Sequence, residues 1–356
     1  MVPPGGNPSG VAGLVVGLIA AAFVASVGTG IAAHAGPMDT PKDRGLHRRA
    51  TATGGGIAIL LGVGVGVTGL ALSHHLAGRP PLAAALALAA VMGIVGAIDD
   101  IRDLGPRLKL LVQVGLALIY ATLFARVEAL STPFGPLPLG RVVGVLGSTL
   151  WIVVVTNAVN FMDGANGLSP GAMILALAGL GASAALGGDP GVATLAWLGA
   201  AAGLGFLPWN LPAGRVFQGD AGALFSSSLF AALVLVAAGP SGEGAISLWF
   251  GPVALLVLLT DVFMTLLARA RRRAPLLSAH RDHLFQRWLI VRGRTHAGLS
   301  LRIWMMTGVL TLAAIGLGRV PVAWRSVVFG ICLALAVAIW RHVDRRTRQA
   351  ELTPSG

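Results

Sequence analysis

The sequence predicts an all-α integral membrane protein that crosses the bilayer about eleven times, with its amino terminus outside and its carboxyl terminus in the cytoplasm. Two observations lead to this prediction. Hydrophobic residues make up 55% of the chain and charged residues only 11%, whereas a soluble domain has about a quarter charged residues. The Lys and Arg residues also gather in alternate connections between apolar stretches. A single membrane domain over residues 1–356 follows, without the soluble basic domain that nucleic-acid binding would need.

Eleven apolar stretches of roughly 18 to 24 residues are each long enough to cross about 30 Å of hydrocarbon. They cover residues 11–33, 54–76, 81–98, 108–124, 142–161, 168–186, 191–209, 221–238, 245–268, 299–317 and 322–340. The first is longer than the core of a signal peptide and follows a segment without Lys or Arg, so we expect a retained anchor. Residues 1–10 and 349–356 are expected to be frayed ends, and 269–298 a cytoplasmic loop with an interfacial helix.

The basic residues set the orientation. With eleven spans and the amino terminus outside, 21 of the 26 Lys and Arg residues fall in cytoplasmic connections, as the positive-inside rule requires. The net charge of +12 then lies on the cytoplasmic face, where it also attracts anionic lipid.

A polar segment ends the fifth stretch, at residues 157–168, with the sequence Asn-Ala-Val-Asn-Phe-Met-Asp-Gly-Ala-Asn-Gly-Leu. Asn157, Asn160 and Asp163 recur every three residues and therefore share one helix face. Polar groups are costly beside lipid, and the glycines that follow permit close approach to the backbone. The segment indicates a binding site, with an ordinary helix cap and turn as the alternative.

Further carboxylates are expected at the same membrane face. Asp99 and Asp100 follow the third stretch, and Asp220 precedes the eighth. Mg²⁺ usually binds one or two carboxylates together with substrate phosphates, so these acids predict a site for a phosphorylated ligand and a hard cation. The alternative is a solvated helix end, which the helix macrodipole makes unfavourable for acids that follow a helix.

The 269–298 loop adds two histidines and an arginine. On a helix, His280, His283 and Arg287 would share one face and form an edge that binds pyrophosphate. The apolar side of such a helix would lie in the membrane interface; it consists of Leu284, Phe285, Trp288 and Leu289.

Two interpretations stay open elsewhere. Asp261 is either functional or satisfied by a nearby threonine, and Gly54 to Gly56 serve either a ligand or helix packing.

These motifs, in this order, resemble the polyprenyl-phosphate N-acetylhexosamine-1-phosphate transferases, a family that includes the phospho-N-acetylmuramoyl-pentapeptide translocase. Lys42 to His47 with the three glycines resemble the first cytoplasmic loop of that family, and residues 157–168 and Gly219-Asp220 resemble its two metal-site loops. The paired-acid motif is represented by Asp99, Asp100, Asp103, Arg107, Lys109 and Gln113. His280-Arg281-Asp282-His283 resembles the histidine loop of the branch that starts O-antigen and capsule synthesis. Asn166 stands where many members have a second acid, and the run of three histidines of the translocase is absent.

The resemblance implies transfer of a sugar 1-phosphate from a UDP-N-acetylhexosamine to undecaprenyl phosphate, with release of UMP, at the inner membrane of a bacterium. It implies Mg²⁺, with Mn²⁺ as a substitute, held by the catalytic aspartates Asp99, Asp100, Asp163 and Asp220. The implied substrate-binding residues are Arg44, His47, Arg107, Lys109, Asn157, Asn160, His280, Arg281, His283 and Arg287. Among these we expect the asparagines at the sugar nucleotide, the histidines and Arg287 at its phosphates, and Arg107 and Lys109 at the lipid phosphate. Membrane lipid is a further partner, and a homodimer is left open.

Three alternatives remain. One is a phospho-N-acetylmuramoyl-pentapeptide transferase, which the missing histidine run disfavours. A second is a hydrolase of lipid-linked phosphates. The third is a secondary transporter, whose site would lie near the bilayer midplane rather than at the cytoplasmic edge.

Overall fold

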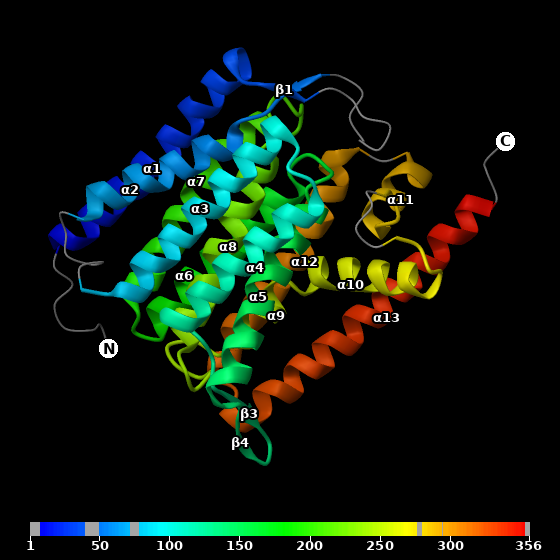
Figure 1. The fold of residues 1–356 in the computed structure, drawn as a ribbon. Coiled ribbons are helices and arrows are strands. Elements are labelled where there is room, and N and C mark those ends of the chain that lie inside the picture. Colours follow the sequence, from blue (N-terminus) through cyan, green and yellow to red (C-terminus); the bar gives the residue numbers. More distant parts are fainter. Residues whose placement is uncertain (1–7, 40–49, 72–77, 276–279, 294, 353–356) are drawn as a thin grey trace.

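The computed structural model describes residues 8–39, 50–71, 78–275, 280–293 and 295–352, and it is a bundle of helices (Figure 1). The helices are α1 Pro8–Ala35, α2 Gly55–Ala71, α3 Pro80–Arg102, α4 Pro106–Leu123, α5 Gly140–Met162, α6 Leu168–Leu186, α7 Pro190–Asn210, α8 Gly219–Ala238, α9 Phe250–Ala254, α10 Leu256–Arg271, α11 Leu284–Arg292, α12 His296–Gly316 and α13 Arg325–Leu352. Two antiparallel pairs of short strands complete the described chain: β1 Met38–Asp39 with β2 Thr51–Ala52, and β3 Ala129–Thr132 with β4 Gly135–Pro138.

The membrane class predicted from the sequence is confirmed. Nine helices within the described ranges are long and apolar enough to cross a membrane. Apolar side chains on the outer helices are widely exposed, for example Phe23 on α1 at 66% and Leu335 on α13 at 59%. Exposed apolar surface of this extent is costly in water and suits lipid. The chain is therefore a multi-pass membrane protein.

One predicted span, the ninth, differs from expectation. The second span, predicted over residues 54–76, is helical as α2 from Gly55 to Ala71, and residues 72–76 lie outside the described residues. The ninth, predicted over residues 245–268, is divided at Leu255 into α9 and α10, and α10 runs across the bundle (Figure 1). Helix also reaches into both segments expected to fray, because α1 begins at Pro8 and α13 continues to Leu352.

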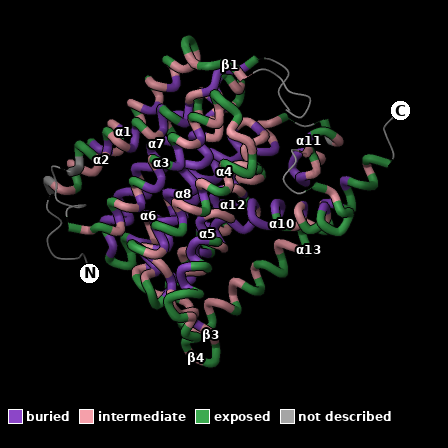
Figure 2. Tube along the Cα trace, in the orientation of Figure 1, coloured by how far each residue is buried: buried purple, intermediate pink, exposed green. Residues whose placement is uncertain are grey.

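Helix α8 lies at the centre of the bundle, between α3 and α5, and 94% of its most apolar stretch is buried (Figure 2). Glycines permit this packing. A Cβ on Gly56 of α2 would collide with the backbone of Gly222, and a Cβ on Gly96 of α3 would collide with that of Asp220. The packing interpretation of Gly54 to Gly56 is thus supported, and the first turn of α8 lies directly against α2 and α3.

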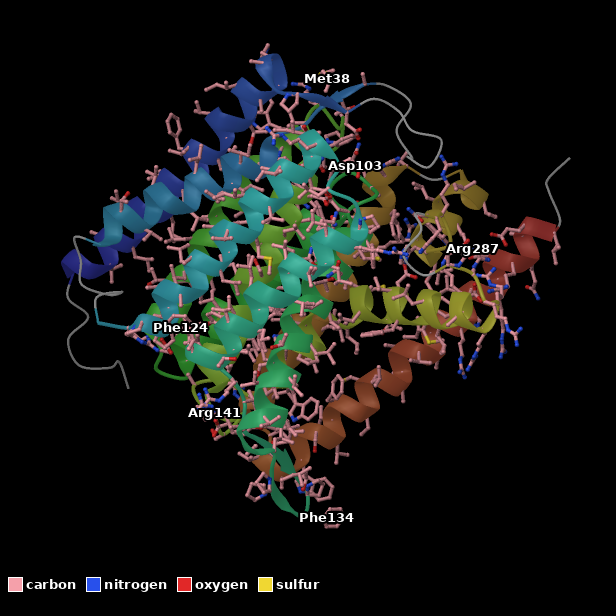
Figure 3. The ribbon with its side chains drawn as sticks, viewed as in Figure 1. Met38, Asp103, Phe124, Phe134, Arg141 and Arg287 are labelled. Atoms are coloured by element: carbon pink, nitrogen blue, oxygen red, sulfur yellow. The ribbon has the colours of Figure 1, made fainter. Side chains whose placement is uncertain are left out.

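The sequence predicts that the connections between spans alternate between the two sides of the membrane. In the structure these connections lie at two different ends of the bundle. Met38 and Asp103 lie at one end, and Phe134, at the tip of the β3–β4 hairpin, lies at the other (Figure 3). At the end away from Met38 and Asp103, the two acids Asp189 and Glu243 pair with Arg79 and Arg325. Each has an arginine partner, because a partly buried carboxylate needs a compensating charge.

Candidate functional site

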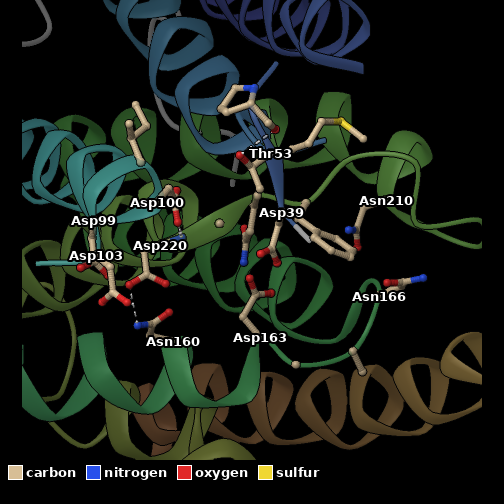
Figure 4. Close-up of a pocket in the computed structure, with 18 of the residues that line it drawn as sticks. Asp39, Thr53, Asp99, Asp100, Asp103, Asn160, Asp163, Asn166, Asn210 and Asp220 are labelled. Atoms are coloured by element: carbon tan, nitrogen blue, oxygen red, sulfur yellow. Dashed lines mark hydrogen bonds between the residues drawn. The ribbon is translucent and has the colours of Figure 1, made fainter. Parts of the chain in front are cut away.

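A cavity of about 530 Å³ opens at the end of the bundle where the sequence places the cytoplasm (Figure 4). The ends of α3, α5 and α7 and the starts of α8 and α12 meet there, together with β1. Six aspartates line it: Asp39, Asp99, Asp100, Asp103, Asp163 and Asp220. Among the described lining residues there is no Lys or Arg. The described lining is therefore rich in carboxyl groups, which are the ligands that a hard cation prefers.

Asp100 connects the end of α3 to the beginning of α8. Its carboxylate accepts hydrogen bonds from the backbone N–H groups of Asp220, at 2.8 Å, and Ala221, at 3.2 Å. A helix amino terminus favours a negative charge, so α8 compensates for the unfavourable position of this acid at the end of α3. Gly219 makes the contact possible, since it has a φ of +64° and a Cβ there would strike the Asp100 carboxylate.

Asp99 and Asp220 converge on a lysine. The Lys109 ammonium, in the first turn of α4, donates to Asp99 at 2.8 Å and to Asp220. Asp99 also accepts from the N–H of Leu104, and Asp220 accepts from the Asn160 amide at 3.3 Å. Two carboxylates thus share one partly buried cation. We expected Lys109 at the lipid phosphate, and the structure places it between the two acids.

Asp163 caps the end of α5 and lines the cavity. Its carboxylate accepts from the Ser169 hydroxyl at 2.7 Å, and Ser169 in turn accepts from the Gln218 amide at 2.7 Å. Burial raises the pKa of the Asp163 carboxyl to about 8, against the lowering effect of these hydrogen bonds.

The structure does not bring all the expected residues to the cavity. Asn157 donates to Gln113 at 2.6 Å and to the carbonyl of Val153, away from the lining residues. Arg107 is exposed at the start of α4. Arg44 and His47 lie outside the described residues.

The expected helix over His280, His283 and Arg287 is wrong, because α11 begins only at Leu284 and His283 is its N-cap. Asp261 explains this start, since its carboxylate accepts from the backbone N–H groups of Leu284 and Phe285. Asp261 therefore caps α11, and the nearby Thr265 hydroxyl also donates to its carboxylate, at 3.3 Å.

None of His280, Arg281, His283 and Arg287 is among the described lining residues of the cavity. The two imidazoles stack at 5.0 Å between ring centres. Burial, with neighbouring positive groups, lowers the pKa of His280 to about 4, and burial also lowers the pKa of His283. Arg287 binds the carboxylates of α13, at 2.6 Å for Asp344.

The apolar side of α11 also differs from expectation. Leu284, Phe285 and Leu289 are each at most 8% exposed. Phe285 and Leu289 belong to the protein core and Trp288 packs against it, so these side chains do not lie in the membrane interface. The neighbouring helices are α10, α12 and α13. A short helix that is held by protein on its apolar side is a fixed part of the cavity wall and not a membrane-surface helix.

Several lining residues were not identified from the sequence. Asn210 ends α7, and its amide accepts from Gly167 and donates to Val216, so it shapes the turn after Asp163. The rule used for Asp163, a polar residue at an inner helix end, would also have found Asn210. Asp39, Gln286 and His296 gave no comparable pattern in the sequence.

Comparison with known proteins supports the resemblance. The model of the family described as glycosyl transferase family 4 matches residues 82–238, which include Asp99, Asp100, Asp163 and Asp220. A Bacillus subtilis protein named probable undecaprenyl-phosphate N-acetylglucosaminyl 1-phosphate transferase is 27% identical, over 94% of this chain and 91% of its own.

Two other relatives are similar over different extents. A decaprenyl-phosphate N-acetylglucosaminephosphotransferase of Mycolicibacterium smegmatis is 29% identical over 91% of this chain and 87% of its own. A phospho-N-acetylmuramoyl-pentapeptide-transferase of a Synechococcus species is 38% identical, but over only 53% of this chain and 57% of its own.

Proposed function

The chain belongs to glycosyl transferase family 4, and from that premise we propose that it transfers an N-acetylhexosamine 1-phosphate from a UDP-sugar to a polyprenyl phosphate, with release of UMP. The cavity of six aspartates at one end of the bundle is the observation that carries this proposal. Relatives that match nearly the whole chain are named for transfer of N-acetylglucosamine phosphate to a polyprenyl phosphate. We propose the same reaction here, at the cytoplasmic face of a bacterial inner membrane.

The donor atoms of the cavity suit Mg²⁺, which prefers carboxylate oxygens and substrate phosphates. Within the described chain no three His, Cys, Asp or Glu side chains converge as around a metal ion. Asp99 and Asp220 do meet at the Lys109 ammonium, which shows that this position accommodates positive charge. We propose that Asp99 and Asp220 hold the ion, with Asn160 beside them. When bound, Mg²⁺ would neutralise charge on the pyrophosphate of the donor.

Asp100 and Asp163 have different proposed roles. The Asp100 carboxylate is bound to the amino terminus of α8, so it orients Asp220. Asp163 fixes the turn between α5 and α6 through Ser169, and a neighbouring cation would hold it ionised. Lys109, once a divalent ion relieves the repulsion between Asp99 and Asp220, is free to bind a phosphate oxygen of a substrate.

The proposed reaction needs little help from a general base. A phosphate monoester has its second pKa near 6, so the lipid phosphate is largely a dianion at pH 7. Its oxygen attacks the β-phosphorus of the donor, the bond from that phosphorus to the oxygen that bridges it to the α-phosphorus breaks, and UMP takes both electrons. We propose this direct attack rather than an aspartyl intermediate, because the carboxylates of Asp99, Asp100 and Asp163 are each held by internal hydrogen bonds.

The location of the cavity disfavours transport. The acids lie at helix ends and not near the middle of the bundle, where the sites of secondary transporters usually lie. The second candidate is transfer of a muramoyl-pentapeptide phosphate, which the Synechococcus relative favours by its name.

Mass spectrometry of the lipid product distinguishes these functions. Detergent-purified protein would be given Mg²⁺, undecaprenyl phosphate and, in separate reactions, UDP-N-acetylglucosamine, UDP-glucose or UDP-N-acetylmuramoyl-pentapeptide. We expect undecaprenyl-diphospho-N-acetylglucosamine as the main product. A lipid product only with the pentapeptide donor would support the second candidate, and no lipid product with any donor would contradict both.

A further inference from the structure

Gln286, on α11, has a buried acceptor that the protein leaves unused. The side chain is 8% exposed and lines the cavity. Its amide oxygen Oε1 has no hydrogen-bond partner in the described part of the chain. A buried acceptor without a donor costs about 1–3 kcal/mol, so such a group in a cavity wall indicates that a ligand supplies the donor.

The position of Gln286 is fixed from both sides. At the start of α11, the Asp261 carboxylate accepts from the N–H of Leu284 at 2.9 Å. One residue after Gln286, the guanidinium of Arg287 donates to Asp344 at 2.6 Å and to Glu351 at 2.9 Å. Since α11 has only nine residues, these two attachments leave the Gln286 side chain little freedom to move away from the cavity.

Gly164 lies beside the Gln286 amide. A Cβ on Gly164 would lie 3.3 Å from the Gln286 amide nitrogen, so a glycine there keeps the space beside the amide open. Ala165 follows and also lines the cavity. The carboxylates that suit a cation and phosphates are at Asp99 and Asp220. Gln286 itself carries an uncharged amide, which suits a neutral portion of the ligand better than its phosphates.

The asparagines expected to bind the sugar are already engaged. Asn157 donates to Gln113 and Val153, and Asn160 donates to Asp220. On the basis of the proposed function, we propose that Gln286 recognises the donor sugar by accepting a hydrogen bond from its acetamido N–H. The methyl group of the acetamido would then lie toward Ala165. Gln286 is thus a residue that selects N-acetylated over plain hexoses.

The test measures the preference of the protein between two donors. For wild-type protein and Gln286→Met, kcat/KM would be measured with UDP-N-acetylglucosamine and with UDP-glucose, and donor binding would be measured by calorimetry without lipid acceptor. Methionine keeps the length of the side chain but has no amide. We expect the preference for the acetylated donor to fall about 5- to 150-fold, since an unpaired N–H costs about 1–3 kcal/mol, while kcat/KM for UDP-glucose stays within about twofold.

Two further variants separate recognition from folding. Gln286→Glu retains acceptor oxygens and should retain most of the preference. Thr311→Val removes another buried polar atom that has no partner in the described chain and does not line the cavity, and the ratio between donors should not change. If Gln286→Met lowers kcat/KM equally for both donors, or leaves their ratio unchanged, the inference is wrong. Turnover by the wild-type protein would still support the proposed function. No turnover and no binding of any UDP-sugar by the wild-type protein would overturn both.

Discussion

Removal of the Asp261 carboxylate is expected to release α11 from the wall of the cavity. Asp261 is 4% exposed and accepts from the N–H of Leu284 at 2.9 Å, the N–H of Phe285 at 3.3 Å and the indole N–H of Trp340 at 3.0 Å. The first two bonds cap α11, and the third ties α10 to α13. In Asp261→Ala all three donors lose their acceptor.

The structure gives the size of the effect. Each buried donor left without a partner costs about 1–3 kcal/mol, but water can reach part of α11 once it loosens, so the three costs do not add fully. We expect α11 to lose roughly 2–4 kcal/mol of local stability. The equilibrium constant for its opening would then rise about 30- to 1,000-fold. Thr265→Val is the matched control, because it removes only a 3.3 Å bond to the same carboxylate.

Hydrogen exchange measured by mass spectrometry provides the assay. Peptides that cover α11 should exchange faster in Asp261→Ala, while peptides from the buried α6 should not change. The Thr265→Val variant should resemble wild type in both regions. Unchanged protection of α11 in Asp261→Ala would refute the conclusion that this carboxylate holds the helix in place.

Three other predictions concern the cation, the acids and pH. EDTA should abolish transfer and added Mg²⁺ or Mn²⁺ should restore it, because the acidic cavity repels the donor pyrophosphate without a cation; full activity in EDTA would contradict this. Asp99→Asn and Asp220→Asn should each lower kcat by about 100-fold or more, whereas Asp189→Asn at the other end should affect thermal stability more than kcat; equal losses of kcat would contradict the site. Since the pKa of His280 is lowered in the folded state, the unfolded state binds more protons between about pH 4 and 6.5 and stability falls as the pH drops through that range. His280→Gln should reduce the loss of melting temperature between pH 7 and pH 5, and an identical pH dependence in wild type and variant would argue against the buried imidazole.

The sequence predicts the cluster of acids because each acid belongs to a different helix end. Asp99, Asp163 and Asp220 adjoin three apolar stretches, and the positive-inside rule assigns their ends to one face before any packing is known. Helices that end at the same face of one bundle bring such side chains within reach of one another. Their convergence in one cavity therefore follows from topology.

The partners of individual side chains could not be predicted in the same way. Arg287 seemed available for pyrophosphate, but Asp344 and Glu351 of α13 bind it, and they are 57 and 64 residues away in the chain. The start of α11 is similarly set by Asp261 on another helix. Local periodicity carries no information about which helix packs beside which, so contacts of this kind need the structure.

The fate of the β-phosphorus of the donor tests the central claim most directly. Purified protein would be given Mg²⁺, undecaprenyl phosphate and UDP-N-acetylglucosamine labelled with ³²P at the β-phosphate. If the pyrophosphate bond is broken by attack of the lipid phosphate, the label appears in the lipid and the released nucleotide is unlabelled UMP. Label recovered in UDP would show transfer of the sugar alone, label recovered in water-soluble sugar phosphate would show hydrolysis, and either result would contradict the proposed function.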